Sequence, residues 1–335
     1  MEKLRISNST VDTILSKFKS TFYKTNTTKA EEILKDKNKA TKLLDSAMET
    51  AKSNRRGALD EIWEKLQLVF SLMKDWIKGD YKEIPKASLI IIVIGFIYLV
   101  TPIDIIPDFL PGGFIDDVVV LGFLLRKIGS DLDSYQIWKR EKESIGYYDE
   151  NTSSFFDKTA HIDMSDVYEE FERYLEEGDS VLDLGCGSGR DSKHFIEKGY
   201  RVTSVDGSKE LCKPASDYIG QEVLNLSFKE IDFNKEFDGI WACASLLHLP
   251  SKQMPKILEK IRRALKDEGV CYLSFKYGTG ETMVGKRLFS CYTETMFKEL
   301  IEQNRGFDLE HMWLTMDKRE GHEEKWLNAI IKRRI

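Results

Sequence analysis

Cysteine is scarce in this 335-residue sequence, and its distribution excludes two kinds of architecture. All five cysteines lie in the second half of the chain, and no two have CxxC spacing. An odd number of scattered thiols suits neither a disulfide framework nor a zinc site. The first twenty residues are charged throughout, so we expect no signal peptide. The sequence therefore predicts a cytoplasmic protein with no metal.

An excess of positive charge is also missing. The chain has 50 Lys and Arg against 56 Asp and Glu, which gives a net charge of −6. This balance disfavours a protein that coats nucleic acid, and we expect no nucleic-acid partner. Apolar residues make up 41% of the chain, enough to form cores, and the length favours about two domains.

The first eighty residues favour helix. Apolar side chains recur at helical spacing in two places: Ile14, Phe18 and Phe22, then Ile62, Leu66, Val69 and Met73. Between them, Lys24 to Lys42 is polar and reads as a solvated helix or a flexible arm. We therefore predict a helical or flexible arm over residues 1–50, followed by a helical domain over residues 51–133.

Long apolar runs are few, and the longest is marginal for a membrane span. Residues 87–103 are 17 positions without a charge, at the lower limit of the ~17–25 needed to cross hydrocarbon. A second apolar run, Val118 to Leu125, is shorter. A buried helical hairpin fits this pattern, and so does a shallow membrane insertion through residues 87–125.

A tract rich in proline and aspartate joins the two apolar runs. Pro102, Pro107 and Pro111 break or start helices, and a Gly-Gly pair allows a tight turn. Two interpretations apply to the acidic side chains of the tract, helix capping and a cation cluster, and capping is favoured. These side chains are Asp104, Asp108, Asp116 and Asp117.

The same segment resembles the YkvA-like domain of unknown function, DUF1232. The family signature is an apolar helix followed by YLxxPxDxIPDxxPxxGxxDD, and Tyr98–Asp117 reads YLVTPIDIIPDFLPGGFIDD. The match covers about 40 residues. The resemblance implies membrane association but no established chemistry.

The second half alternates short apolar strands with helices, which is typical of βαβ units on a parallel sheet. Strand patterns occur at residues 180–184, 201–205, 236–242 and 269–275, and Lys252–Leu265 reads as an amphipathic helix. We predict an α/β, Rossmann-like doubly wound domain over residues 146–335, preceded by an all-α region. The polar segment 134–145 is the expected linker.

A glycine loop carries the strongest functional signal. Residues 181–191 read VLDLGCGSGRD, a buried strand that runs into Gly185, Gly187 and Gly189 before a helix. Glycines at the carboxyl end of a strand let the backbone approach a ligand closely. A second acid, Asp206, ends the next strand, where a carboxylate can accept hydrogen bonds from both hydroxyls of a ribose.

These features resemble the class I S-adenosylmethionine-dependent methyltransferases over about residues 146–335. Tyr147–Phe155 and the late pattern of Trp313, Asp317 and Trp326–Asn328 are similar to subfamily features. Small-molecule methyltransferases of the type 11/12 and tellurite-resistance kind look most similar. The resemblance implies S-adenosylmethionine as cofactor and no metal. It implies cofactor contacts from Asp183, Gly185, Cys186, Gly187, Gly189, Arg190, Asp206, Gly207, Ser208, Ser227, Phe228 and Ala244, with Glu230 as an alternative at the adenine edge.

The acceptor side is less defined. Ser245, Lys276, Tyr277, Arg287 and Tyr292 are candidate substrate residues, and His248 is the candidate general base because an imidazole titrates near neutral pH. A sulfonium methyl needs mainly proximity and alignment for in-line transfer. A thiol or chalcogen acceptor needs no base, whereas an oxygen or nitrogen acceptor does.

We therefore predict methyl transfer to a small molecule. Protein or nucleic-acid methylation is an alternative, although ACASLLHLP stands where amino-methylating DNA enzymes carry [DNS]PP[YFW]. The other alternative is a module that binds S-adenosylmethionine without turnover and is recruited by the helical region. The protein partner is unknown.

Overall fold

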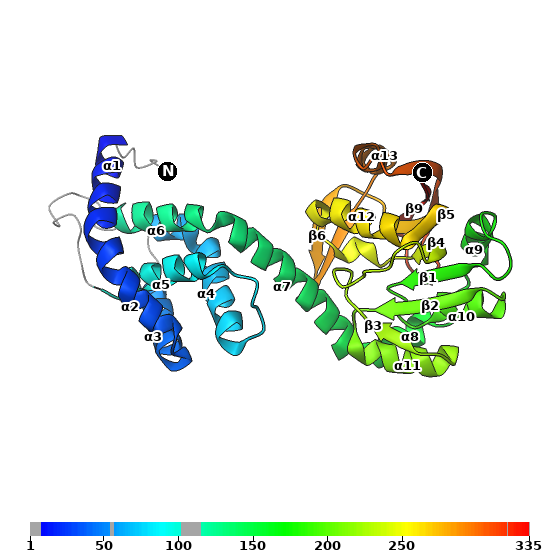
Figure 1. Cartoon of the computed structure of the whole chain (residues 1–335), viewed down its shortest axis with the longest axis horizontal. Coiled ribbons are helices and arrows are strands. Elements are labelled where there is room, and N and C mark those ends of the chain that lie inside the picture. Colours follow the sequence, from blue (N-terminus) through cyan, green and yellow to red (C-terminus); the bar gives the residue numbers. More distant parts are fainter. Residues whose placement is uncertain (1–7, 54–56, 102–114, 320, 335) are drawn as a thin grey trace. The chain divides into compact units, whose positions relative to one another are not determined.

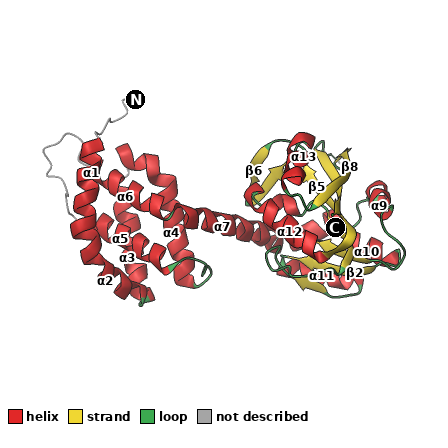
Figure 2. Cartoon of the chain, turned by 45° about the horizontal axis from the view of Figure 1, so that its top comes forward, coloured by secondary structure: helices red, strands yellow, loops and turns green. Residues whose placement is uncertain are grey.

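A computed structural model describes residues 8–53, 57–101, 115–319 and 321–334. The chain divides into two compact units, Met1–Trp138 and Lys139–Ile335. The first is built of helices and the second of a sheet covered by helices (Figures 1 and 2).

The described part of the first unit is helical. Its elements are α1 (Asn8–Lys17), the π-helical η1 (Phe18–Tyr23), α2 (Lys24–Leu34), α3 (Lys37–Ser53), the 3-10 helix η2 (Gly57–Ile62), α4 (Trp63–Lys78), α5 (Lys86–Val100), α6 (Ile115–Lys127) and the start of α7 (Gly129–Glu150). The polar stretch Lys24 to Lys42 forms α2 and part of α3, which pack on α5 through small buried side chains such as Ala30 and Ala40. The alanines let these helices approach α5 closely.

Helix α5 lies at the centre of the first unit. Its sequence is apolar on all sides, and such a helix is stable in water only when other elements cover it. Helices α2, α3 and α6 pack around it, and the ring of Phe96 lies 5.4 Å from that of Phe70 on α4. Within the described residues, no helix combines the length and apolarity that crossing a bilayer requires.

Most of the Pro-Asp tract lies outside the described residues. Asp104 and Asp108 fall in this gap, and the side chains of Asp116 and Asp117 are outside the description as well. The choice between helix capping and a cation cluster therefore stays a prediction.

The second unit is a mixed sheet of order β3-β2-β1-β4-β5-β9-β8. Strands β1 to β5 are parallel, and β9 runs antiparallel to β5 and β8. The strands are β1 (Ser180–Leu184), β2 (Arg201–Asp206), β3 (Val223–Asn225), β4 (Phe237–Ala242), β5 (Leu265–Lys276), β8 (Phe307–Met316) and β9 (Lys325–Arg333). A separate hairpin consists of β6 (Gly280–Val284) and β7 (Arg287–Cys291). The predicted α/β fold with its central parallel strands is confirmed.

Helices cover both faces of the sheet because its side chains alternate between two cores. Val181 packs with α9 (Ser165–Glu172) and α10 (Arg190–Glu197), whereas its neighbour Leu182 packs with α12 (Met254–Ala264) and α13 (Glu294–Gln303). Two further helices are α8 (Thr152–Thr159) and α11 (Lys209–Ile219). Strands buried on both faces hold the loops at their carboxyl ends firmly.

The structure places the predicted linker, residues 134–145, inside helix α7, and the boundary between the two units falls within this segment. The segment is polar, but Gln, Lys, Arg and Glu are also good helix formers. An i,i+4 ion pair joins Lys139 to Glu143 on the exposed side, and Glu141 and Ser144 are buried. The segment is therefore a helix with one buried face, and its other charged side chains point toward solvent.

Candidate cofactor and acceptor site

The glycine loop connects β1 to α10 through three left-handed residues. Gly185, Gly187 and Gly189 have φ of 82°, 56° and 79°, a region that favours glycine. A Cβ on Gly185 would lie 2.5 Å from the Cβ of Ser245, and one on Gly189 would lie 2.8 Å from Ile219. The loop therefore requires glycine for both its conformation and its close packing.

Asp206 lies beside this loop at the end of β2. One carboxylate oxygen accepts the backbone N–H of Gly187 at 2.9 Å, and the other accepts that of Ser208 at 2.8 Å. Burial raises the pKa of Asp206, and these two backbone donors oppose the rise. The carboxylate is thus held in a fixed orientation at the edge of a cavity.

The cavity has a volume of about 460 Å³ and is bounded by β-strand ends, α7 and the β6–β7 hairpin. Fourteen of the eighteen predicted site residues line it: Gly185, Cys186, Gly187, Arg190, Asp206, Gly207, Ser208, Ser227, Phe228, Ala244, Ser245, His248, Lys276 and Arg287. The strand ends thus gather residues from distant parts of the sequence into one site. Glu230, the alternative adenine-edge acid, instead accepts hydrogen bonds from Ser227 in an exposed turn.

The structure does not bring the other four predicted residues to the cavity. Asp183 lies beneath the loop, 1% exposed, and accepts the hydroxyl of Ser192 at 2.6 Å. Gly189 packs against α11. Tyr277 is 38% exposed on the surface, and the Tyr292 ring is buried beside Phe275 and Phe297.

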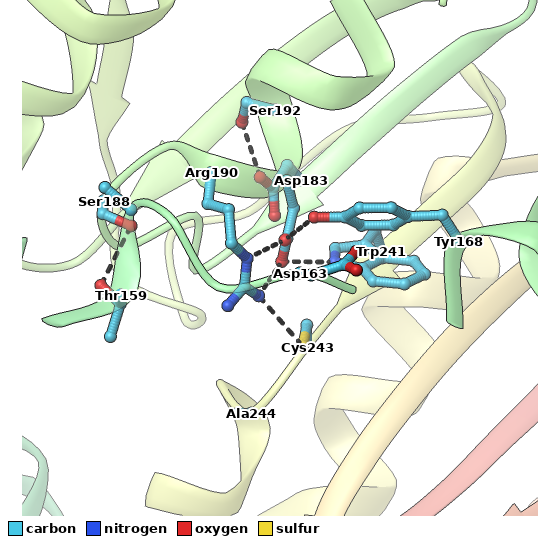
Figure 3. Close-up of polar contacts among 12 residues, drawn as sticks. Thr159, Asp163, Tyr168, Asp183, Ser188, Arg190, Ser192, Trp241, Cys243 and Ala244 are labelled. Carbon is cyan, nitrogen blue, oxygen red and sulfur yellow. Dashed lines mark hydrogen bonds and ion pairs between the residues drawn. The ribbon is translucent and has the colours of Figure 1, made fainter. Parts of the chain in front are cut away.

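Arg190 is oriented by a buried carboxylate, Asp191. Its Nε and Nη2 donate to the two oxygens of Asp191 at 2.6 and 2.9 Å. The same carboxylate accepts the Tyr168 hydroxyl at 2.5 Å and the Trp241 indole N–H at 2.8 Å. Figure 3 shows Arg190 between this cluster and Cys243. Among the described residues Nη1 has no partner, and Arg190 lines the cavity.

His248 is paired with a tyrosine that the sequence analysis did not select. The Leu288 carbonyl lies 2.7 Å from Nδ1 and can only accept, so Nδ1 carries the proton. The Nε2 atom therefore accepts the Tyr148 hydroxyl, which lies 2.6 Å away. The predicted general base thus has its lone pair occupied, and Tyr148 is the group that presents an oxygen to the cavity.

Burial lowers the pKa of His248 to about 4, and Arg287 and Lys276 add to the effect. An unfolded histidine titrates near 6.5. Between these values only the unfolded chain binds the proton, so the free energy of unfolding falls as the pH drops from about 6.5 to about 4. We expect His248 to stay a neutral Nδ1–H tautomer down to about pH 5. Long-range ¹H–¹⁵N NMR, with His248→Asn to assign the signal, tests this, and a midpoint near 6.5 contradicts it.

Helix α7 contributes a wall of the cavity that the sequence analysis missed. Glu141, Ser144, Ile145 and Tyr148 follow helical i, i+3, i+4, i+7 spacing and all line the cavity. One oxygen of Glu141 pairs with Lys229, and the other, Oε1, is buried without a hydrogen-bond partner. The helical spacing of these four residues could have predicted this wall from the sequence. The many charged residues of the segment favoured a linker instead.

Three side chains at the acceptor end, Asp317, His322 and Glu324, have ligand atoms within 4.8 Å of one another. Asp317 already accepts Arg319 and the Trp326 indole, and Glu324 accepts Lys276 at 3.0 Å. Side-chain cations thus neutralise both carboxylates, and the cluster does not require a metal.

The cavity fits S-adenosylmethionine in several respects. Asp206 can accept ribose hydroxyls, and two buried orphaned oxygens, Ser245 Oγ and Glu141 Oε1, belong to residues that line the cavity. Burial raises the pKa of the Cys186 thiol well above its usual range, so this residue is a small packing group and no nucleophile.

Comparisons with known proteins agree with this fold. Models described as a methyltransferase domain and as a protein of unknown function (DUF1232) match residues 181–269 and 88–123. YkvA of Bacillus subtilis, described as an uncharacterised membrane protein, is 39% identical over 71 residues, 21% of this chain and 67% of YkvA.

Two methyltransferases are similar to the second unit. Cypemycin N-terminal methyltransferase of a Streptomyces species is 33% identical over 106 residues, 29% of this chain and 42% of that protein, so the match spans less than half of that relative. The solved 1,6-didemethyltoxoflavin-N1-methyltransferase of Burkholderia thailandensis, which holds S-adenosylhomocysteine, is 23% identical with a TM-score of 0.48, covering 57% of this chain and 85% of that one. The chain belongs to the DUF1232 family of YkvA, and its second unit contains a methyltransferase domain over residues 181–269.

Proposed function

We propose that the second unit transfers a methyl group from S-adenosylmethionine to a small molecule. The observation that carries this proposal is a single cavity in which a cofactor cradle, the glycine loop with Asp206, continues into an end lined by Tyr148, His248 and Arg287. The bound cofactor supplies an activated methyl group on a sulfonium. The chain's own residues then have to orient both partners and exclude water.

On the cofactor side, we assign three anchoring roles. Arg190, held by Asp191, binds the methionine carboxylate through its open Nη1. Asp206 binds the ribose hydroxyls, and Glu141 Oε1 accepts the adenine amino group. The first and third assignments give Arg190 Nη1 and Glu141 Oε1 the partner that each lacks among the described residues, and the Asp206 oxygens keep further lone pairs beside the two backbone bonds that they accept.

On the acceptor side, the predicted general base is a weak one. His248 is neutral, its Nε2 is engaged by Tyr148, and its lowered pKa makes it a weak proton acceptor. The Tyr148–His248 pair can accept a hydrogen bond and align an acceptor. This favours an acceptor that arrives already nucleophilic, such as a thiolate or a neutral amine.

A small molecule fits the acceptor end better than a macromolecule. Val284, Arg287 and Phe289 of the β6–β7 segment form one wall of the cavity. Ion pairs fasten this segment to α7, from Arg140 to Glu281 at 3.1 Å and from Lys286 to Glu150 at 2.7 Å. A recessed site walled in this way admits a free metabolite more readily than a polymer.

The test is to incubate the protein with S-adenosylmethionine that carries a tritiated methyl group and a cell lysate. The lysate is then divided into small-molecule, protein and nucleic-acid pools. We expect the label in the small-molecule pool. Label in either polymer pool overturns the small-molecule proposal, and cofactor binding without transfer to any pool supports a binding module instead. Asp206→Ala serves as the inactive control.

Glu141→Ala is expected to weaken binding of S-adenosylmethionine by about tenfold, because one buried hydrogen bond of about 1–2 kcal/mol is lost. Glu230→Ala is the matched control, because it removes an acid that follows β3 in an exposed turn and does not line the cavity. Calorimetric titration of both variants measures the effect. Unchanged affinity for Glu141→Ala, or a loss confined to Glu230→Ala, contradicts the assignment.

A further inference from the structure

Arg287 differs from the other cations around the acceptor end. Lys276 pairs with Glu324 at 3.0 Å, Arg319 pairs with Asp317 at 2.5 Å, and Lys286 pairs with Glu150 at 2.7 Å. Within the part of the chain that the structure describes, Arg287 has no carboxylate partner. One cation of this group therefore keeps its full charge at the cavity.

The guanidinium of Arg287 lies against two aromatic rings, and it shares one of them, Phe289, with Lys276. Its guanidinium carbon lies 4.2 Å from the ring centre of Tyr147 and 5.1 Å from that of Phe289. The guanidinium opposes the rise that burial gives to the pKa of Tyr148, whose hydroxyl donates to Nε2 of His248 at 2.6 Å. The Nε–H of Arg287 is buried and has no hydrogen-bond partner. Stacking on rings orients the guanidinium but does not neutralise it.

A partly buried cation without a counter-charge is costly, and so is a buried N–H without an acceptor. A ligand with anionic oxygens removes both costs at once, because a carboxylate matches the planar fork of a guanidinium. Tyr148, Phe155, Phe289 and Trp326 surround the same space with flat rings. These rings suit a planar molecular body.

We propose that Arg287 binds the carboxylate of the methyl acceptor, and that the acceptor is a small planar organic acid. This proposal rests on the proposed function. The carboxylate is an anchor and not the reacting group. A lone pair on another atom of the acceptor forms the bond to the methyl carbon, the carbon–sulfur bond breaks onto sulfur, and any proton on the reacting atom leaves to water. The product therefore keeps its negative charge.

The test compares two unreactive probes, 2-naphthoate and 2-naphthamide, which have nearly the same shape and differ in charge. Each is titrated by calorimetry into the full chain loaded with S-adenosylhomocysteine. We expect the carboxylate to bind about 30-fold more tightly than the amide. Arg287→Met is expected to abolish this preference, and Arg287→Lys to retain part of it. Lys286→Met is the matched control, because it removes a neighbouring cation with a 55% exposed side chain that does not line the cavity.

Equal affinity for the two probes in the wild type, or no binding of either, overturns the anion site without the need for any variant. Retention of the preference in Arg287→Met overturns the role of Arg287. The proposed function is tested separately by tritium transfer. A selective anion site in a protein that transfers no methyl leaves this inference standing and removes the proposed function. Methyl transfer to small molecules, combined with equal affinity for the two probes, supports the proposed function and overturns this inference.

Discussion

Asp191→Ala is expected to lower the free energy of unfolding of the second unit by about 3–5 kcal/mol, because it removes one partner of a buried ion pair. Arg190 would keep a charge whose side chain is 17% exposed, without a counter-ion. The Tyr168 hydroxyl and the Trp241 indole N–H would lose the acceptor that they share. Chemical denaturation followed by tryptophan fluorescence measures the loss, since Trp241 reports directly on this core.

Asp191→Asn gives a graded comparison, with an expected loss of about 2 kcal/mol, because the amide keeps one acceptor oxygen. Arg173→Ala removes an ion pair whose arginine side chain is 65% exposed, and it should change stability by no more than about 0.5 kcal/mol. A loss below about 1 kcal/mol for Asp191→Ala would contradict the structural role of this carboxylate.

The pKa of Asp191 adds a pH dependence to this result. Burial by itself would raise that pKa, but Arg190 and the hydrogen bonds from Tyr168 and Trp241 outweigh burial and lower it. A lowered pKa means that the stabilisation is present above the unfolded value, near ~3.9, and is lost as the pH falls through the folded value. The difference between the wild type and Asp191→Ala should therefore shrink in acid.

Asp206→Ala is expected to weaken binding of S-adenosylmethionine by about 100- to 1000-fold. Two hydrogen bonds that a carboxylate accepts from vicinal hydroxyls are together worth about 3–4 kcal/mol. The substitution also frees the backbone N–H groups of Gly187 and Ser208, which hold the loop in position. Calorimetric titration of the full chain with S-adenosylmethionine measures the change.

The control for this experiment is Asp232→Ala, which removes an acid whose side chain is 76% exposed. It changes net charge equally and should leave the affinity unaltered. Circular dichroism shows whether the Asp206 variant is folded. If the Asp206→Ala variant is folded and binds S-adenosylmethionine as tightly as the wild type, Asp206 does not bind the ribose.

The sequence predicted the fold of the second unit because strand and loop signals there are local. Gly185, Gly187 and Asp206 lie within about 25 residues, and parallel strands bring their carboxyl ends to one edge. On the cofactor side, residues that are close in the sequence are therefore also close in the structure, and the sequence pattern predicts their arrangement well. His248 was also found, since it lies in the short segment between β4 and α12, at the same edge of the sheet.

The acceptor side was predicted only in part, for a physical reason. Its walls come from α7, from the β6–β7 hairpin and from β8 and β9, which are far apart in the chain and meet only in the folded sheet. Nothing local distinguishes Arg287, which lines the cavity, from Lys286, which pairs outside it. Tyr277 and Tyr292 were chosen by residue type; they follow the last residues of β5 and β7 and do not line the cavity.

Helix α7 limits how this chain can be cut or recombined. It starts in the first unit, and its later turns carry Glu141 and Tyr148 along the cavity. A fragment that begins at residue 151 would keep every strand and the whole glycine loop, yet it would lack one side of its binding pocket. These later turns are therefore part of the binding domain and cannot be treated as a spacer of free length. A residue inserted between Glu141 and Tyr148 would break their i, i+7 spacing and turn one of the two side chains about 100° away from the cavity.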